Sequence, residues 1–167
     1  MFPWFPNPFY NRHIVIRLNK NKVGVFFTRK IFFYVYDSNK LKKEKFDFTL
    51  KGEKVTNSDK KAFFKQCELV SHGKFSHKTK NSIVFPKTKE LFEGVIKWDN
   101  SIALLLKDRF LIFSQNGKYL TSINYPKILR ARTFSDYNAR PENIFVKDKY
   151  LYVLNEDNCI EIFNLKF

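Results

Sequence analysis

The chain has 167 residues, the usual size of one domain, and it contains no apolar run of the roughly 18 to 20 residues that span a bilayer. Hydrophobic residues make up 44% and charged residues 28%, which excludes both a disordered chain and a membrane protein. Aromatic residues make up 18%, including 20 Phe and 8 Tyr, and they favour a β-rich fold because they suit a half-buried pleated surface.

The net charge is +15. A charge of this size and sign is typical of proteins that bind nucleic acid or an acidic membrane surface. Most of the 31 basic residues are Lys, however, and they are spread through the expected strand ends and turns. Because Arg binds phosphate in a bidentate way and Lys does not, composition explains the charge as readily as an anionic partner does.

Residues 1–12 are expected to be irregular. The segment MFPWFPNPFYNRH lacks a basic start, and Pro3, Pro6 and Pro8 interrupt its apolar character. It therefore does not have the pattern of a signal peptide, and a cytoplasmic location is the default expectation.

Three stretches of the chain share one pattern without gaps: Val25–Asp37, Ile102–Ser114 and Tyr152–Asn164. In each, an apolar strand meets a short polar turn, and a second apolar strand ends in an aromatic residue followed by a polar one. The aromatic residues are Tyr36, Phe113 and Phe163, and the polar residues are Asp37, Ser114 and Asn164. The pattern predicts three β-hairpins.

Further strands are expected beside these hairpins. One strand is expected before each hairpin: His13–Leu18, a strand around Ile96–Lys97, and Ile144–Lys147. One more strand is expected after each of the first two hairpins: Lys45–Phe48 and Tyr119–Ile123. Before the last of these strands, Asn116-Gly117 supplies the positive φ angles of a tight hairpin. Each unit is therefore expected to be a meander of up to four antiparallel strands, the arrangement of a β-propeller blade.

Two of the stretches resemble NHL-like six-bladed β-propellers. They are FLIFSQNGKYLTSI (110–123) and ARPENIFVKDKYLYVLNEDNCIEIFN (139–164), and the resemblance extends over about 91–167 and, more loosely, 13–50. It implies an all-β fold of antiparallel meander repeats, a partial β-propeller of three to four blades. Because closed rings need at least four blades, the chain is expected to be a fragment of a larger propeller; association with copies of itself or with a partner, and closure in some smaller way, are the alternatives.

The expected division of the chain follows from these repeats. It is an irregular segment over 1–12, blade-like repeats over 13–50, 83–126 and 139–167 (the last cut short), and a Lys-rich insertion or degenerate blade over 51–82. Two structures are open for the insertion. One is a short helix capped by Ser58-Asp59, with Phe63, Cys67 and Val70 on one face; the other is a pair of strands over Gln66–Val70 and Ser82–Phe85, which we favour.

A metal site is considered in the same insertion, where Cys67, His72 and His77 have C-x4-H-x4-H spacing. A closed zinc site needs four ligands, and the position three residues before Cys67 is Phe64. Neither a metal nor any other cofactor is therefore expected. The sequence leaves open whether Cys67 pairs with Cys159, the other cysteine of the chain.

The fold and its turns lead to a functional hypothesis: a non-catalytic binding or scaffold module that takes a protein or peptide partner through loop residues. The candidate ligand-binding residues are Asn39, Lys40, Asn116, Gly117, Lys118, Asp148 and Lys149. The alternative is a basic protein that binds nucleic acid or another anionic surface, through Lys42, Lys43, Lys60, Lys61, Lys74, Lys78 and Lys80. A propeller hydrolase or lyase ranks third, because no nucleophile, phosphate-loop or dinucleotide motif is present.

Overall fold

The computed structural model describes residues 12–70, 80–81, 83–106, 108–124, 144–154 and 159–164. The described residues form two compact units. The smaller unit comes from residues 51–90, and the larger one comes from residues 12–50 and 91–164. Within the described ranges, no helix has the length and apolar character that crossing a membrane requires.

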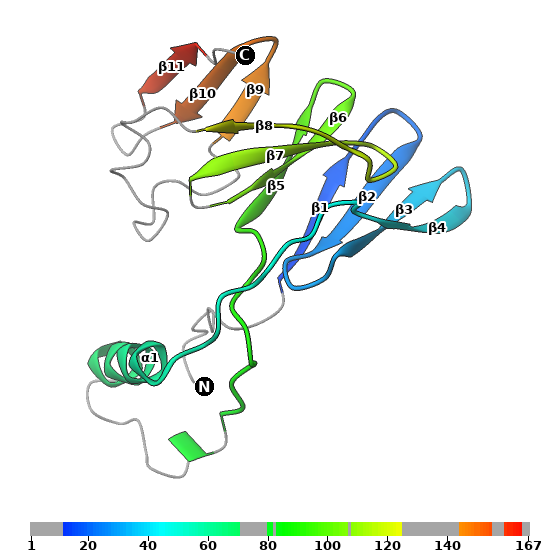
Figure 1. Cartoon of the computed structure of the whole chain (residues 1–167). Helices are drawn as coiled ribbons and strands as arrows, with labels where there is room; N and C mark the ends of the chain where they lie inside the picture. The colour runs from blue at the N-terminus through cyan, green and yellow to red at the C-terminus, as the bar shows by residue number, and fades with distance from the viewer. Residues whose placement is uncertain are drawn as a thin grey trace. The chain divides into compact units, whose positions relative to one another are not determined.

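The larger unit contains three antiparallel sheets, each a meander of consecutive strands (Figure 1). The first sheet has β1 (His13–Arg17), β2 (Lys22–Phe27), β3 (Phe32–Asp37) and β4 (Lys40–Lys45). The second has β5 (Gly94–Trp98), β6 (Ser101–Leu105), β7 (Arg109–Ser114) and β8 (Tyr119–Asn124). The third has β9 (Ile144–Lys147), β10 (Tyr150–Leu154) and β11 (Ile160–Asn164). The prediction of a mainly antiparallel β protein is thus confirmed, with three or four strands in each sheet.

The sheets pack through two apolar cores. We call the face that a sheet turns toward the next sheet in the chain its forward face, and the opposite one its rear face. One core joins the forward face of the first sheet (Ile14, Ile16, Phe26, Phe33, Val35) to the rear face of the second (Val95, Ile102, Leu104, Leu111, Phe113). The other joins the forward face of the second sheet (Ile96, Trp98, Ala103, Leu105, Phe110, Ile112) to the rear face of the third (Ile144, Val146, Leu151, Val153).

The middle sheet shows in its sequence why it is covered on both sides. In β6 and β7, the runs IALL and FLIF are buried at every residue. A strand with one solvated face would instead alternate covered and exposed positions, as β1 does with its half-buried and exposed residues. The first strands of the sheets, β1, β5 and β9, also lie against one another in succession.

Several turns of the three sheets lie at a common end. In a meander the turn between strands one and two is at the same end as the turn between strands three and four. The backbone has positive φ angles in these turns, at Ser38, Asn39, Asp99, Gly117 and Asp148. Such angles are favourable for Gly and tolerated by Asn and Asp, which explains the composition of this end.

The predicted alignment of the repeats is correct for the third strands and wrong for the second strands. The aromatic residues Tyr36, Phe113 and Phe163 occupy equivalent places in β3, β7 and β11. The hairpin loops, however, differ in length. Between the paired residues Phe26–Phe33, Leu105–Phe110 and Leu154–Ile160 there are six, four and five residues. An alignment without gaps therefore moves β2 by two residues and β10 by one, and the latter shift exchanges the two faces of the strand.

The strand expected over Lys45–Phe48 is also wrong. The fourth strand of the first sheet begins at Lys40, because Ser38 and Asn39 alone form a two-residue turn with Asp37 paired to Lys40. Two consecutive positive φ angles match the twist of a hairpin, so pairing resumes at once. Phe46 follows the strand and is buried in the first core.

The insertion contains a helix, and the pair of strands that we favoured for it is wrong. Helix α1 (Asn57–Val70) includes Gln66–Val70, and Ile83–Phe85 is not a strand, while Ser82 lies outside the described residues. Phe63 and Cys67 are one helical turn apart and both are buried, as the alternative predicted. Phe63 and Phe64 contact Phe85 edge to face.

The helix begins with a reciprocal pair of hydrogen bonds. The Asp59 N–H donates to Thr56 Oγ1 at 3.2 Å, and the Thr56 N–H donates to Asp59 Oδ2 at 2.8 Å. This is a capping box with Thr56, rather than Ser58, at the N-cap. Asp59 also forms an ion pair of 2.9 Å with Lys89. Hydrogen bonds from Thr56, followed by the one from Lys89, hold the pKa of Asp59 well below its usual range.

The capping box leads to a pH-dependent prediction for the smaller unit. Because the pKa of Asp59 is lower in the folded than in the unfolded chain, its stabilising effect is present above a pH of about 4 and is lost as the pH falls toward the folded-state value. We expect the wild-type helix to be more stable than that of Asp59→Asn at neutral pH, and the difference to disappear in acid. Thermal unfolding followed by far-UV circular dichroism from neutral pH into the acid range measures this. A difference that stays constant with pH would contradict it.

Candidate functional site

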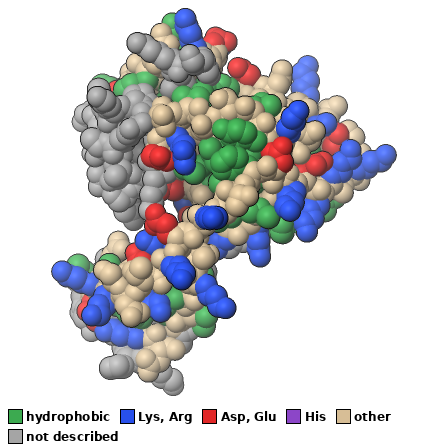
Figure 2. Space-filling model, in the orientation of Figure 1, with side chains coloured by type: hydrophobic (Ala, Val, Ile, Leu, Met, Phe, Trp, Pro, Cys, Tyr) green, Lys and Arg blue, Asp and Glu red, His purple; other side chains and the backbone are tan. Residues whose placement is uncertain are grey.

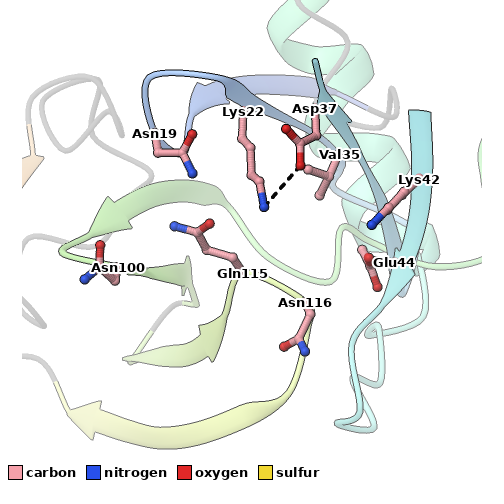
Figure 3. A pocket seen from close by; sticks show the side chains of 9 residues that line it. All are labelled: Asn19, Lys22, Val35, Asp37, Lys42, Glu44, Asn100, Gln115 and Asn116. Atoms are coloured by element: carbon pink, nitrogen blue, oxygen red, sulfur yellow. Dashed lines mark ion pairs between the residues drawn. The ribbon is translucent and has the colours of Figure 1, made fainter. Parts of the chain in front are cut away.

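A polar cleft lies in the larger unit at the common end of the turns. Its volume is about 520 Å³. Residues from the first two sheets line it: Asn19, Lys22, Val35, Asp37, Lys42, Glu44, Asn100, Gln115 and Asn116. We call it the turn cleft (Figure 3). Its lining contains side-chain amides, two lysines and two carboxylates, and one apolar residue.

The first sheet forms one wall of the turn cleft. Lys22 begins β2 and Asp37 ends β3, and the two residues are paired in the sheet. Lys22 Nζ and Asp37 Oδ2 form an ion pair of 3.2 Å, with both side chains about one-third exposed. Lys42 and Glu44 alternate along β4 on the same face as Val35. An ion pair at this exposure stabilises the fold little, so its main effect is to orient the two side chains.

The opposite wall is formed by turns of the second sheet. Gln115 and Asn116 lie in the turn between β7 and β8, where the Ser114 hydroxyl donates a hydrogen bond to Asn116 Oδ1. Lys22 and Gln115 point into the turn cleft from opposite sides (Figure 3). Asn100 lies in the turn between β5 and β6. Each amide offers both a hydrogen-bond donor and an acceptor.

The turn between β7 and β8 differs in detail from the tight Asn-Gly turn expected from sequence. Only Gly117 has a positive φ angle, 87°. The Gly117 N–H donates to the Ser114 carbonyl at 3.0 Å, and the Ser114 N–H donates to the Lys118 carbonyl at 2.8 Å. This is the longer hairpin loop in which a turn is followed by a left-handed Gly. Asn116 therefore keeps ordinary backbone angles, and its side chain lines the turn cleft.

The candidate ligand-binding residues are divided among three turns. Asn116, Gly117 and Lys118 are in the turn of β7 and β8, Asn39 and Lys40 are at that of β3 and β4, and Asp148 and Lys149 are in that of β9 and β10. The last turn joins first and second strands, so it is not equivalent to the other two. Of the seven residues, only Asn116 lines the turn cleft.

Sequence reasoning missed most of the cleft. Asn19 and Asn100 belong to turns between first and second strands, and of these turns only that of the third sheet, at Asp148 and Lys149, supplied predicted ligand-binding residues. Comparing those turns would have shown polar residues with Asn in both. Lys22, Asp37 and Glu44 carry no signal of their own in the sequence, because only the packing of two sheets brings them to one cleft.

The lysines proposed for anion binding do not all belong to one unit. Lys42 and Lys43 are on β4 in the larger unit, Lys60, Lys61 and Lys80 are in the smaller one, and Lys74 and Lys78 lie outside the described residues. Lys43 lies over the Phe32 ring at 4.0 Å, and Lys80 forms an ion pair with Glu68. On the face seen in Figure 2, basic side chains are scattered, with acidic ones between them.

The three candidate metal ligands are not brought together in the described structure. His72 and His77 lie outside the described residues. Among the residues that are described, no group of three or more His, Cys, Asp or Glu side chains could hold a metal ion. Cys67 is buried, which raises the pKa of its thiol, and Cys67 and Cys159 do not form a disulfide with each other.

Comparisons with known proteins return no relatives. No protein-family model matches the chain. No curated protein and no solved structure matches it either.

Proposed function

We propose that this protein is a non-catalytic binding module of the β-propeller type, in which the three sheets act as blades and the turn cleft takes a peptide segment of a partner protein. Three features of the larger unit support the blade interpretation. The sheets share one meander order, they stack face to face, and their first strands β1, β5 and β9 follow one another. In propellers the first strands surround a central axis, and turns gather at the ends of the blades.

The observation that carries the peptide proposal is the chemistry of the cleft lining. Side-chain amides from three turns, Asn19, Asn100 and the pair Gln115-Asn116, lie around one opening. Amide side chains can pair with the N–H and C=O groups of an extended peptide, because each one both donates and accepts. Lys22 with Asp37, and Lys42 with Glu44, add both signs of charge. A cleft with both signs suits a peptide with mixed polar side chains better than a polyanion.

Peptide selection with a matched counter-selection tests the proposal. Peptides are enriched on the wild-type protein from a random library displayed on phage, and their affinities are measured by calorimetry. We expect the double variant Gln115→Ala/Asn116→Ala to weaken binding by about 10-fold or more, since it removes two amides worth about 1 kcal/mol each. In an NMR titration, we expect the side-chain amides of Asn19 and Asn100 to shift.

The control is Asn39→Gly. It removes an amide from the equivalent turn of the first sheet, outside the turn cleft, and Gly accepts the positive φ angle of 75° found there. Its affinity for the selected peptides should equal that of the wild type. The proposal is wrong if the selected peptides bind the double variant equally well. It is also wrong if only oligonucleotides bind and their affinity falls steeply with salt, which would favour the anion-binding alternative.

A further inference from the structure

The two outer faces of the three-sheet stack are apolar and exposed. The forward face of the third sheet exposes Phe145 by 59%, Leu154 by 39%, Ile160 by 63% and Ile162 by 60%. The rear face of the first sheet exposes Val15 by 63%, Tyr36 by 47% and Leu41 by 64%. Contiguous apolar surface of this kind on a sheet marks an interaction site or an aggregation hazard.

The exposed positions of the third sheet are equivalent to buried positions of the second. Tyr150 begins the second strand of the third sheet and pairs with Asn164, and Ser101 begins the second strand of the second sheet and pairs with Ser114. Matching these two pairs fixes the equivalence of β10 and β11 with β6 and β7. Ile162 then corresponds to Ile112, which is 5% exposed. Ile160 and Leu154 correspond to Phe110 and Leu105, which are both fully buried.

The same relation holds at the other end of the stack. Asp37 and Ser114 both end a third strand, so Tyr36 corresponds to Phe113, which is fully buried. Val15 corresponds in the same way to Val95, which is 3% exposed. The rear face of the first sheet therefore has the apolar pattern that the rear face of the second sheet buries. A forward face like that of the third sheet would cover the rear face of the first sheet.

We propose that a second copy of this chain covers both faces. The rear face of the first sheet of each copy packs on the forward face of the third sheet of the other, so that two copies close a ring of six sheets. A contact between two different faces either closes a ring or continues into a filament. Rings of stacked sheets have about four to eight members, and two copies give six whereas three would give nine. This inference rests on the repeated sheets and not on the turn cleft, which lies within one copy.

The first test is the mass of the protein in solution, measured by sedimentation velocity and by size exclusion with light scattering. We expect the wild-type chain to have twice the mass of one copy at micromolar concentrations. Tyr36→Lys blocks the rear face of the first sheet, and Ile162→Glu blocks the forward face of the third. Each variant alone is expected to lose the dimer, because both junctions then contain a buried charge.

Mixing the two variants tests the pairing of unlike faces. In a mixed dimer one junction has the wild-type residue on both sides, and the other contains the two introduced charges, which are opposite in sign. We therefore expect the mixture to recover the dimer that neither variant forms alone. A dimer made through the same face of both copies would instead be lost in only one of the two variants, since the other substitution lies outside its interface.

Matched controls separate loss of the dimer from loss of the fold. Leu69→Lys and Val84→Glu make the same chemical changes at exposed apolar residues of the smaller unit, which are 68% and 88% exposed, and should leave the mass unchanged. Far-UV circular dichroism should be the same for all variants, and the monomeric Ile162→Glu should still bind the selected peptides. A monomeric wild type, a filament, an unchanged mass in both variants, or a failed recovery would overturn the proposal. The proposal would also be overturned if the wild type binds an oligonucleotide and Tyr36→Lys does not, because the rear face of the first sheet would then bind nucleic acid and not a second copy.

Discussion

Substitution of Phe113 by alanine is expected to lower the free energy of unfolding of the larger unit by about 3 to 5 kcal/mol. Phe113 lies on β7 and is fully buried in the core between the first and second sheets. Its ring centroid is 4.7 Å from that of Phe46 and 5.7 Å from that of Tyr119. The substitution removes these ring contacts and leaves a cavity between two sheets, which the surrounding strands can fill only in part. Chemical denaturation followed by tryptophan fluorescence measures the change.

Leu120→Ala is the control for this experiment. Leu120 is on β8 of the same sheet and is 50% exposed, so its truncation should cost less than about 1 kcal/mol. A loss at Phe113 as small as that at Leu120 would mean that β7 does not turn Phe113 toward the first sheet. The predicted alignment of the third strands would then be wrong as well.

Gly117→Ala is expected to cost about 2 to 4 kcal/mol, a large effect for the addition of a single methyl group. Gly117 has a φ angle of 87°, which an L-residue adopts only with strain. A Cβ atom there would lie 2.3 Å from the backbone oxygen of Lys45. The Gly117 carbonyl also accepts a hydrogen bond of 3.0 Å from the Asp47 N–H. The turn of the second sheet is thus docked on the chain that leaves the first, and the methyl group must push it away.

Hydrogen exchange identifies where this effect acts. The amides of Asp47 and Tyr119, which donate to the Gly117 carbonyl and to the Asp47 carboxylate, should lose protection in Gly117→Ala before the rest of the sheets. The control is Asp148→Gly, which relieves a positive φ angle of 53° in another turn and should change stability by only a few tenths of a kcal/mol. Equal stability of Gly117→Ala and the wild type would show that the turn is not docked as described.

The sequence by itself was sufficient for three hairpins and for their assignment to separate sheets, but not for β4, which it placed at Lys45–Phe48. Aromatic and β-branched runs broken by polar turns marked the β2–β3, β6–β7 and β10–β11 hairpins, because alternation and turn chemistry are local properties. The sequence also offered a helix capped by Ser58-Asp59, although the N-cap is Thr56, and this prediction competed with an apolar run around Gln66–Val70 that fits a strand as well. A short apolar run fits a helix and a strand equally well. The segment is a helix because that places Phe63 and Cys67 on one buried face.

Register and the site were decided only by the tertiary structure. Loops of unequal length shifted β2 and β10 against the predicted alignment, and nothing in the sequence of a strand states which residue of its neighbour it faces. The turn cleft has the same origin, since Lys22 and Gln115 are distant in the chain and meet because two sheets stack through their apolar faces. Composition and local pattern determine which segments form strands. Long-range packing determines which polar side chains share an opening.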